Sequence, residues 1–340
     1  MGQGFASLLM GASTLALALP QPPAQFPVKA ITSISGAACV HARPWVCSTS
    51  RPNVTLSFGL TAAGQAWIQQ NGWPIADMAP GAVRINNGQG LSMTSQILPI
   101  EVQSPTVIAI GNFQHPAAII YLDSGRLPAW PRQPLDTRPP SHNVPPPKVF
   151  TGGPAARHAY LAAIVRANRQ ERKAAFVLPG GFARLSPVDQ LFVLANLERI
   201  VHGLWPLYGV SRTLNHYAVV GARRGTDPEG PPGSSLPWGS NWYSGTGPVA
   251  ATYLWMYDDG YGSGNLACPN KGASGCWGHR DNILGNWGPF GLFGGAVVPS
   301  HRGVGGGTTQ LFQMGVAPAP PAQLTYTWAM AVKAGARPIG

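Results

Sequence analysis

Short apolar and β-branched runs alternate with turn residues through the first third of the chain. Runs of this kind predict β-strands. Residues 61–70 predict a single helix instead, with Thr61 as its cap and its end near Gly72. We therefore expect a β-rich domain over residues 26–127, and we find no catalytic motif in it. The predicted strands cover residues 54–60, 91–98 and 106–110.

The segment that begins at Ser186 predicts a helix, because three start signals agree. Ser186 can cap the first turn, Pro187 suits the first helical position, and Asp189 places an acid near the helix N-terminus. Apolar residues follow on two faces, so neighbours should cover the helix on two sides until Gly203 ends it. Glu198 and Arg199 interrupt the pattern near its end, and we expect them to form an ion pair at the surface.

Further helices and then strands complete the second half. Residues 155–175 predict a helix with a basic second half, which either packs on the next domain or acts as a stiff connector over residues 155–184. Helices before strands predict an α+β fold for residues 185–340. The remaining helices are expected at 211–221 and 248–257, and the strands of one antiparallel sheet at 292–298, 309–314 and 324–332.

Two segments outside these elements have distinct compositions. Residues 128–154 are rich in proline, which favours extended conformations and predicts a linker at the domain boundary. The apolar run from Phe5 to Leu19 has the length and the Pro-rich flank of a secretory signal, so residues 1–25 are expected to be a signal peptide. Because no basic residue precedes Lys29, retention as an anchor stays an alternative.

Composition and charge narrow the classes of function. The chain has 43 Gly and 35 Pro, which favours irregular structure, and a net charge of +11 from scattered basic residues. Peripheral contact with anionic surfaces is therefore expected. Nucleic-acid binding is not, because no basic stripe interleaved with aromatic residues is present.

Four cysteines occur as two local pairs with the same separation, Cys39 with Cys47 and Cys268 with Cys276. This pattern predicts two local disulfides and an oxidising compartment. A site of four thiolates for a metal would use the tighter C-x-x-C spacing, which is missing here.

The stretch from Cys276 to Leu284 concentrates candidate chemistry in a chain with only 10% charged residues. His279 could act as a general acid or base near neutral pH, oriented by Asp258, Asp259 or Glu198. Alternatively, His279 and its neighbour Arg280 bind loop carbonyls and carboxylates and lock the loop.

Ser240 with His279 and Asp258 could imitate a nucleophilic triad, but no G-x-S-x-G elbow surrounds this serine. Aromatic residues are frequent around the same region, either as core or as a platform for sugar rings or apolar ligands. They are Trp238, Trp242, Tyr243, Trp255, Tyr257, Tyr261, Trp277 and Trp287.

Three motifs follow one another in the second half of the chain. They are Asn196-Leu197-Glu198-Arg199 with Gly203-Leu204-Trp205-Pro206-Leu207, then Gly239-Ser240-Asn241-Trp242, then Gly278-His279-Arg280 with Asn282-Ile283-Leu284. Together these motifs resemble the CAP superfamily, which includes cysteine-rich secretory proteins, antigen five and pathogenesis-related proteins. The resemblance covers residues 185–333 and is greatest to bacterial SCP-like members.

The resemblance implies a three-layer α-β-α sandwich with a central antiparallel sheet, in a secreted protein that binds lipids, sterols, glycans or protein partners. Many members line their cleft with two histidines and two acids that can hold a metal. Here His279 and Asp258 or Asp259 match, whereas Ser240 replaces one acid and the earlier histidine is missing. We therefore expect neither a metal nor a cofactor.

These observations predict a secreted or cell-surface binding protein for an envelope glycan, lipid or protein partner, without catalysis. A cell-wall-directed hydrolase or peptidase that uses His279 with a nearby acid is the alternative, and a purely structural envelope protein is a third class. The expected ligand-binding residues are Trp242, Asp258, Asp259, Trp277, His279 and Arg280.

Overall fold

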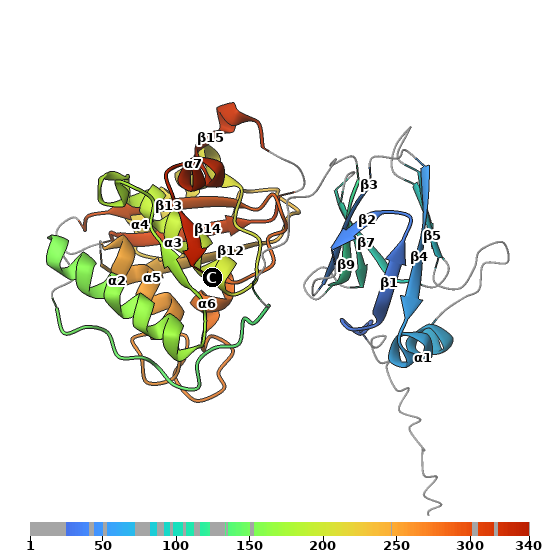
Figure 1. The fold of residues 1–340 in the computed structure, drawn as a ribbon, viewed down its shortest axis with the longest axis horizontal. Coiled ribbons are helices and arrows are strands. Elements are labelled where there is room, and N and C mark those ends of the chain that lie inside the picture. Colours follow the sequence, from blue (N-terminus) through green and yellow to red (C-terminus); the bar gives the residue numbers. More distant parts are fainter. Residues whose placement is uncertain are drawn as a thin grey trace, which may run out of the picture.

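Figure 1 shows the fold of the chain in a computed structural model. Residues 1–24 of the predicted signal peptide and the predicted helix end at Gly72 lie outside the described residues. None of the helices within the described part has the length and apolarity that a bilayer span needs. The structure describes residues 25–40, 44–49, 53–71, 82–86, 92–95, 98–104, 107–111, 116–122, 133, 135–149, 153–245, 247–300, 305–315 and 319–339.

The N-terminal part is a pair of β-sheets with one helix, α1 (Ala62–Asn71). In β4 (Asn53–Leu60) buried and exposed residues alternate, so one face of this strand points into a core that both sheets share. One sheet has the order β1 (Ile31–Ser35), β4, β5 (Ala82–Asn86), β6 (Ser92–Ser95). The other has the order β2 (Ala38–Val40), β3 (Trp45–Thr49), β9 (Pro116–Leu122), β8 (Val107–Gly111), β7 (Ile100–Ser104).

The second sheet is covered on both faces. Every residue of β9 is buried, unlike the alternating pattern of β4. The reason is a separate apolar cluster in which Ile119 and Tyr121 pack with Trp205 and Phe290 of the C-terminal part. The rings of Tyr121 and Phe290 meet edge to face at 5.9 Å. The two parts of the chain therefore share an apolar interface.

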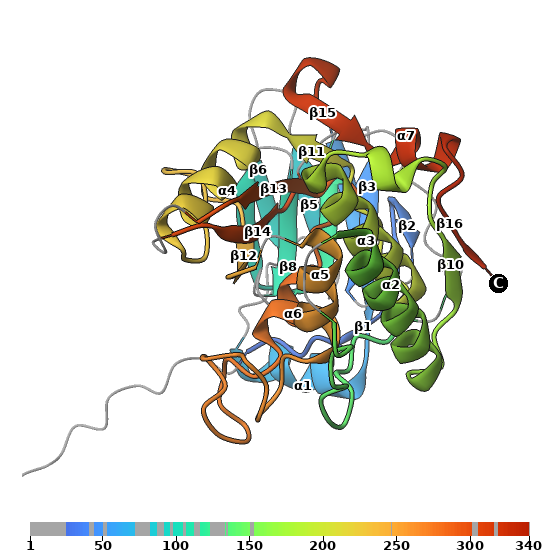
Figure 2. The same cartoon turned by 90° about the vertical axis from the view of Figure 1, so that its left-hand side faces the viewer.

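The C-terminal part has helices on both faces of a five-stranded sheet (Figure 2). The strand order is β12 (Trp238–Tyr243), β14 (Gly307–Gln313), β13 (Leu292–Val298), β11 (Gly209–Ser211), β15 (Leu324–Thr327). One face carries α4 (Arg212–Arg224), and the other carries α3 (Pro187–Val201), with α5 (Pro248–Tyr257) and α2 (Gly153–Gln170) packed beyond it. Shorter elements are β10 (Ala175–Val177), α6 (Gly278–Ile283), α7 (Trp328–Lys333), β16 (Arg337–Ile339) and the 3₁₀ turns Phe182–Arg184 and Pro321–Gln323.

Alternating residues of β13 explain how both helical layers fit against the sheet. Phe293 points into the core on the α3 side, where its ring lies 5.7 Å from that of Phe192. Gly294 faces α4, and a Cβ at this glycine would lie 2.4 Å from the backbone of Leu214. The glycine therefore lets α4 approach the sheet. The α+β class predicted from the sequence is confirmed.

Two details of this sheet differ from the sequence prediction. Strand β11 pairs in parallel with β13, so the sheet is mixed and not wholly antiparallel. The strand expected over 324–332 ends at Thr327, because its hydroxyl accepts a hydrogen bond from the backbone N–H of Met330 at 3.2 Å and starts α7.

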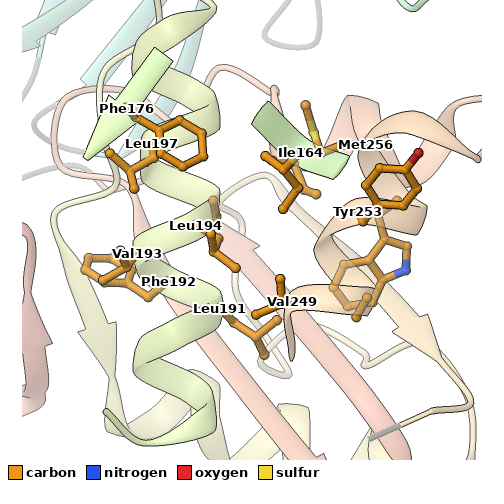
Figure 3. Packing of buried hydrophobic residues seen from close by; sticks show 14 of the residues in the cluster. Ile164, Phe176, Leu191, Phe192, Val193, Leu194, Leu197, Val249, Tyr253 and Met256 are labelled. Carbon is orange, nitrogen blue, oxygen red and sulfur yellow. The ribbon is translucent and has the colours of Figure 1, made fainter. Parts of the chain in front are cut away.

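The start of α3 follows the predicted capping pattern. The Ser186 hydroxyl accepts a hydrogen bond from the Asp189 backbone N–H at 3.1 Å and donates one to the Asp189 carboxylate at 2.7 Å. The helix is then buried along its length, and Figure 3 shows Leu191 and Leu194 beside Val249 of α5. Helix α3 is therefore the central element of the core.

Helix α2 packs on the C-terminal part, which was one of the two roles expected for it. The Tyr160 and Tyr253 rings lie 5.6 Å apart, and Ile164 is fully buried in the same core. The described part of the Pro-rich linker is bound to this domain as well. The Val144 N–H donates to the Tyr257 carbonyl at 2.7 Å, and the Asn143 amide oxygen accepts from the Gly260 N–H at 2.7 Å.

Candidate functional site

The loop before α6 is held by a disulfide and by one asparagine. Both predicted local disulfides are present, Cys39–Cys47 and Cys268–Cys276. Asn265 lies three residues before the second disulfide, and its amide nitrogen donates to the carbonyls of Asp259 and Gly275 at 3.0 and 2.9 Å. The two ends of the loop, at Asp259 and at Gly275, are thereby held together beside α6.

Two of the sequence motifs meet at the other side of α6. The amide nitrogen of Asn241 donates to the His279 carbonyl at 3.0 Å, and that of Asn282 donates to the Ser240 carbonyl at 2.7 Å. A Cβ at Gly239 would lie 2.5 Å from the Asn282 side chain, so the glycine makes room for this contact. Strand β12 thus fixes the position of α6 under the sheet edge.

His279 forms a close pair with Asp259. Its Nδ1 lies 2.6 Å from Asp259 Oδ1, and its backbone N–H donates to Oδ2 at 3.0 Å. Burial acts to lower the pKa of His279, but the hydrogen bond and the charge of Asp259 outweigh it and raise this pKa. Burial also raises the pKa of the Asp259 carboxyl, which His279 offsets only in part. The pair can therefore hold or move one proton near neutral pH.

This pair opens onto a pocket of about 530 Å³. The Trp255 ring stacks near the imidazole of His279, with centroids 6.4 Å apart and planes inclined by 30°. The walls combine indole and phenol rings with several carboxylates. The lining residues are Asp227, Trp242, Tyr243, Ser244, Leu254, Trp255, Asp258, Asp259, Gly264, Asn265, Leu266, Ala267 and His279.

The pocket contains four of the six predicted ligand-binding residues: Trp242, Asp258, Asp259 and His279. Trp277 is half-buried and lies against Gly260, outside the described lining. The sequence left open whether the tryptophans belong to the core or line a ligand site, and the structure contains examples of both. Trp242 and Trp255 line the pocket, whereas Trp287 stacks on Phe312 in the core.

Asp227 is a pocket residue that the sequence analysis missed. It follows the end of α4 and accepts a hydrogen bond from the backbone of Trp242. Burial raises the pKa of its carboxyl, and the charge of His279 acts in the opposite direction. The sequence around it, Gly225-Thr226-Asp227-Pro228, has the composition of an ordinary turn, so no local signal separated it from other loop acids.

Arg280 points away from the pocket into a buried polar network. Its guanidinium donates to both carboxylate oxygens of Glu171, at 3.1 and 2.7 Å, and to the carbonyls of Met256 and Arg138. It also lies 3.0 Å from His202 Nε2. Arg280 is fully buried, so these contacts join α6 to the segment after α2, to α3, to α5 and to the Pro-rich linker.

Glu198 belongs to the same network and not to the surface. Its carboxylate accepts a hydrogen bond from the Tyr257 hydroxyl at 2.7 Å, and burial raises the pKa of this carboxyl to about 7. The surface ion pair expected between Glu198 and Arg199 is wrong. Arg199 is buried and donates to the carbonyls of Trp205, Ile283 and Gly285 instead.

The Ser240 side chain is not among the described pocket residues, and its carbonyl is used by Asn282. Across the described ranges there is no group of three His, Cys, Asp or Glu arranged to hold a metal ion. The disulfides fit an extracellular protein. Comparison with known proteins finds no matching family model, no matching curated protein and no matching solved structure.

Proposed function

We propose that this chain is a secreted binding protein of the CAP type, and that the pocket beside His279 binds an envelope glycan. The observation that carries the proposal is the combination of two indole rings, Trp242 and Trp255, with the convergent carboxylates in one pocket of about 530 Å³. Aromatic faces suit the apolar faces of sugar rings, and carboxylates accept hydrogen bonds from hydroxyls.

The sequence analysis also allowed a lipid or a protein as the ligand. The carboxylates favour a glycan over an acyl chain, because a chain of methylene groups cannot replace the water that these oxygens lose on binding. The two disulfides, the net charge of +11 and the export signal expected from the sequence support a role at an anionic cell envelope.

Strand β12 supplies a matched pair of variants that tests this proposal. Immobilised peptidoglycan, other envelope polysaccharides and phospholipid vesicles would be screened, and each ligand found would be titrated calorimetrically. Trp242→Ala should weaken glycan binding about tenfold, the loss expected for one aromatic contact. Trp238→Ala should have little effect, because Trp238 is 45% exposed and is outside the pocket lining. Equal losses in the two variants, or no binding to any glycan, would contradict the proposal.

A hydrolase is the second candidate, and the Asp259–His279 pair is the observation that favours it. Asp259 occupies Nδ1, which leaves Nε2 as the nitrogen able to accept a proton from water or substrate. The test is turnover of peptidoglycan and of peptide substrates by the wild type, by His279→Ala and by His216→Ala. His216 is exposed on α4 and serves as the control. Turnover that only His279→Ala abolishes would establish the enzyme, and its absence in the wild type would exclude these substrates.

A further inference from the structure

The hydrogen-bond donors of the pocket are largely used by the protein itself. The indole N–H of Trp242 donates to the Gly306 carbonyl at 3.0 Å, and that of Trp255 donates to the Trp242 carbonyl at 3.3 Å. The amide of Asn265 donates to two backbone carbonyls, and Nδ1 of His279 is paired with Asp259. The N–H groups of the two indoles are therefore not available to a ligand, and Trp242 offers it more ring surface than Trp255, which is only 3% exposed.

Carboxylates, in contrast, are concentrated in this pocket. Three of the 12 acidic residues of the chain line this pocket, Asp227, Asp258 and Asp259, although the chain has a net charge of +11. Neither lysine nor arginine is among the described lining residues. His279 is the only histidine there, and it is already paired with Asp259.

Asp258 is the carboxylate most available to a ligand. It is half-buried, and within the described ranges its side chain has no ion pair and no hydrogen bond. Burial raises the pKa of this carboxyl, and the nearby charge of Asp259 raises it further. A cation bound beside Asp258 would relieve both effects, because it would replace lost hydration and balance the second carboxylate.

We propose that the ligand of this pocket carries a free ammonium group, as an amino sugar with an unacetylated amine does, held between Asp258 and the indole walls. This inference rests on the proposed function and specifies its ligand class. An ammonium group supplies the donors that the pocket lacks, and its positive charge is attracted both by carboxylates and by aromatic ring faces. The neighbouring ring carbons of a sugar would contact Leu254 and Ala267.

Two pairs of probes isolate the charge and distinguish its source. An oligosaccharide of glucosamine would be compared with its N-acetylated form, under mildly acidic conditions that protonate its amines. Choline would be compared with its uncharged isostere 3,3-dimethylbutanol, which tests a quaternary ammonium headgroup as the source. Titration calorimetry with the full chain should show glucosamine oligosaccharide binding at least about tenfold tighter than the acetylated form, as one charge-assisted hydrogen bond provides.

Asp258→Asn removes one charge with almost no change of shape, and it should abolish most of this preference without weakening the acetylated sugar. Glu229→Gln is the control, because the Glu229 side chain is 84% exposed and is outside the described pocket lining. Thermal unfolding of both variants would establish that they fold, and Asp227→Asn provides a second pocket variant.

The outcomes separate this inference from the proposed function. If the acetylated and unacetylated oligosaccharides bind equally, or if Asp258→Asn leaves the preference intact, the ammonium inference is overturned while glycan binding stands. If choline binds and the amino sugar does not, the source is a lipid headgroup and the amino sugar is excluded. If no probe binds but another envelope glycan does, the inference fails alone.

Discussion

Glu198→Gln tests whether a carboxyl group is stored in neutral form inside the core. Glu198 is fully buried and faces the Tyr257 hydroxyl, with His202, Arg280 and Glu171 as the surrounding titratable groups. Burial raises its pKa from 4.5 to about 7, so the folded protein holds this proton more tightly than the unfolded chain. The corresponding stability is complete below about pH 4.5 and is lost as the pH rises through about 7.

The magnitude follows from that pKa difference. At about 1.4 kcal/mol for each pH unit, ionisation of Glu198 should cost the wild type about 3 kcal/mol between pH 4.5 and pH values above 7. Glutamine stays neutral and keeps an oxygen for Tyr257. Its amide N–H can donate to Oδ1 of Asn168, an acceptor that has no hydrogen-bond partner in the described structure. The variant should therefore lose this pH dependence.

Urea unfolding followed by circular dichroism, from about pH 4 to about pH 8, measures the effect. The free energy of unfolding of Glu198→Gln, relative to the wild type, should increase by about 3 kcal/mol across this range. Glu229→Gln, at an exposed position, should show a difference that does not change with pH. A constant difference for Glu198→Gln would refute the reasoning, since it would mean that folding does not raise the pKa of Glu198.

The other predictions concern single contacts. Arg280→Met should lower the free energy of unfolding by about 3–5 kcal/mol, because it leaves the Glu171 carboxylate without its buried partner. Adding Glu171→Gln to this variant should restore part of the lost stability. Tyr121→Phe should raise the free energy of unfolding by about 1–3 kcal/mol, because the Tyr121 hydroxyl is buried without a partner in the described structure. An unchanged free energy of unfolding would show that this hydroxyl has a partner. Cys268→Ser with Cys276→Ser should cost about 2.5 kcal/mol for a loop this short and should weaken ligand binding more than Cys39→Ser with Cys47→Ser, measured by urea unfolding and calorimetry.

Local patterns were sufficient for the elements whose signals lie within a few residues. Ser186 caps α3 as its spacing to Asp189 predicts, and the predicted helix 248–257 coincides with α5. The alternating residues of β4 point into the sandwich core. In contrast, β15 ends earlier than its apolar run, because the Thr327 hydroxyl binds the next turn and a helix begins there. An apolar run alone does not distinguish a strand from a short helix.

The candidate site was predicted in part. His279, Asp258, Asp259 and Trp242 were found because they belong to motifs or to a local concentration of polar and aromatic residues, and the structure brings them into one pocket. Asp227 was missed because it lies 52 residues before His279 in a turn of ordinary composition. Residues from different elements converge only through the packing of α4, β12, α5 and α6.

By itself, the sequence determined the disulfide pairs, the start of α3 and the β-rich character of the first half, because each depends on neighbouring residues. Only the tertiary structure decided the direction of each polar side chain. Next to one another in α6, His279 turns to the pocket while Arg280 turns to Glu171 in the core. Adjacent positions of a helix face different directions, and what each one meets is set by other segments of the chain: Asp259 lies 20 residues from His279, and Glu171 lies 109 residues from Arg280.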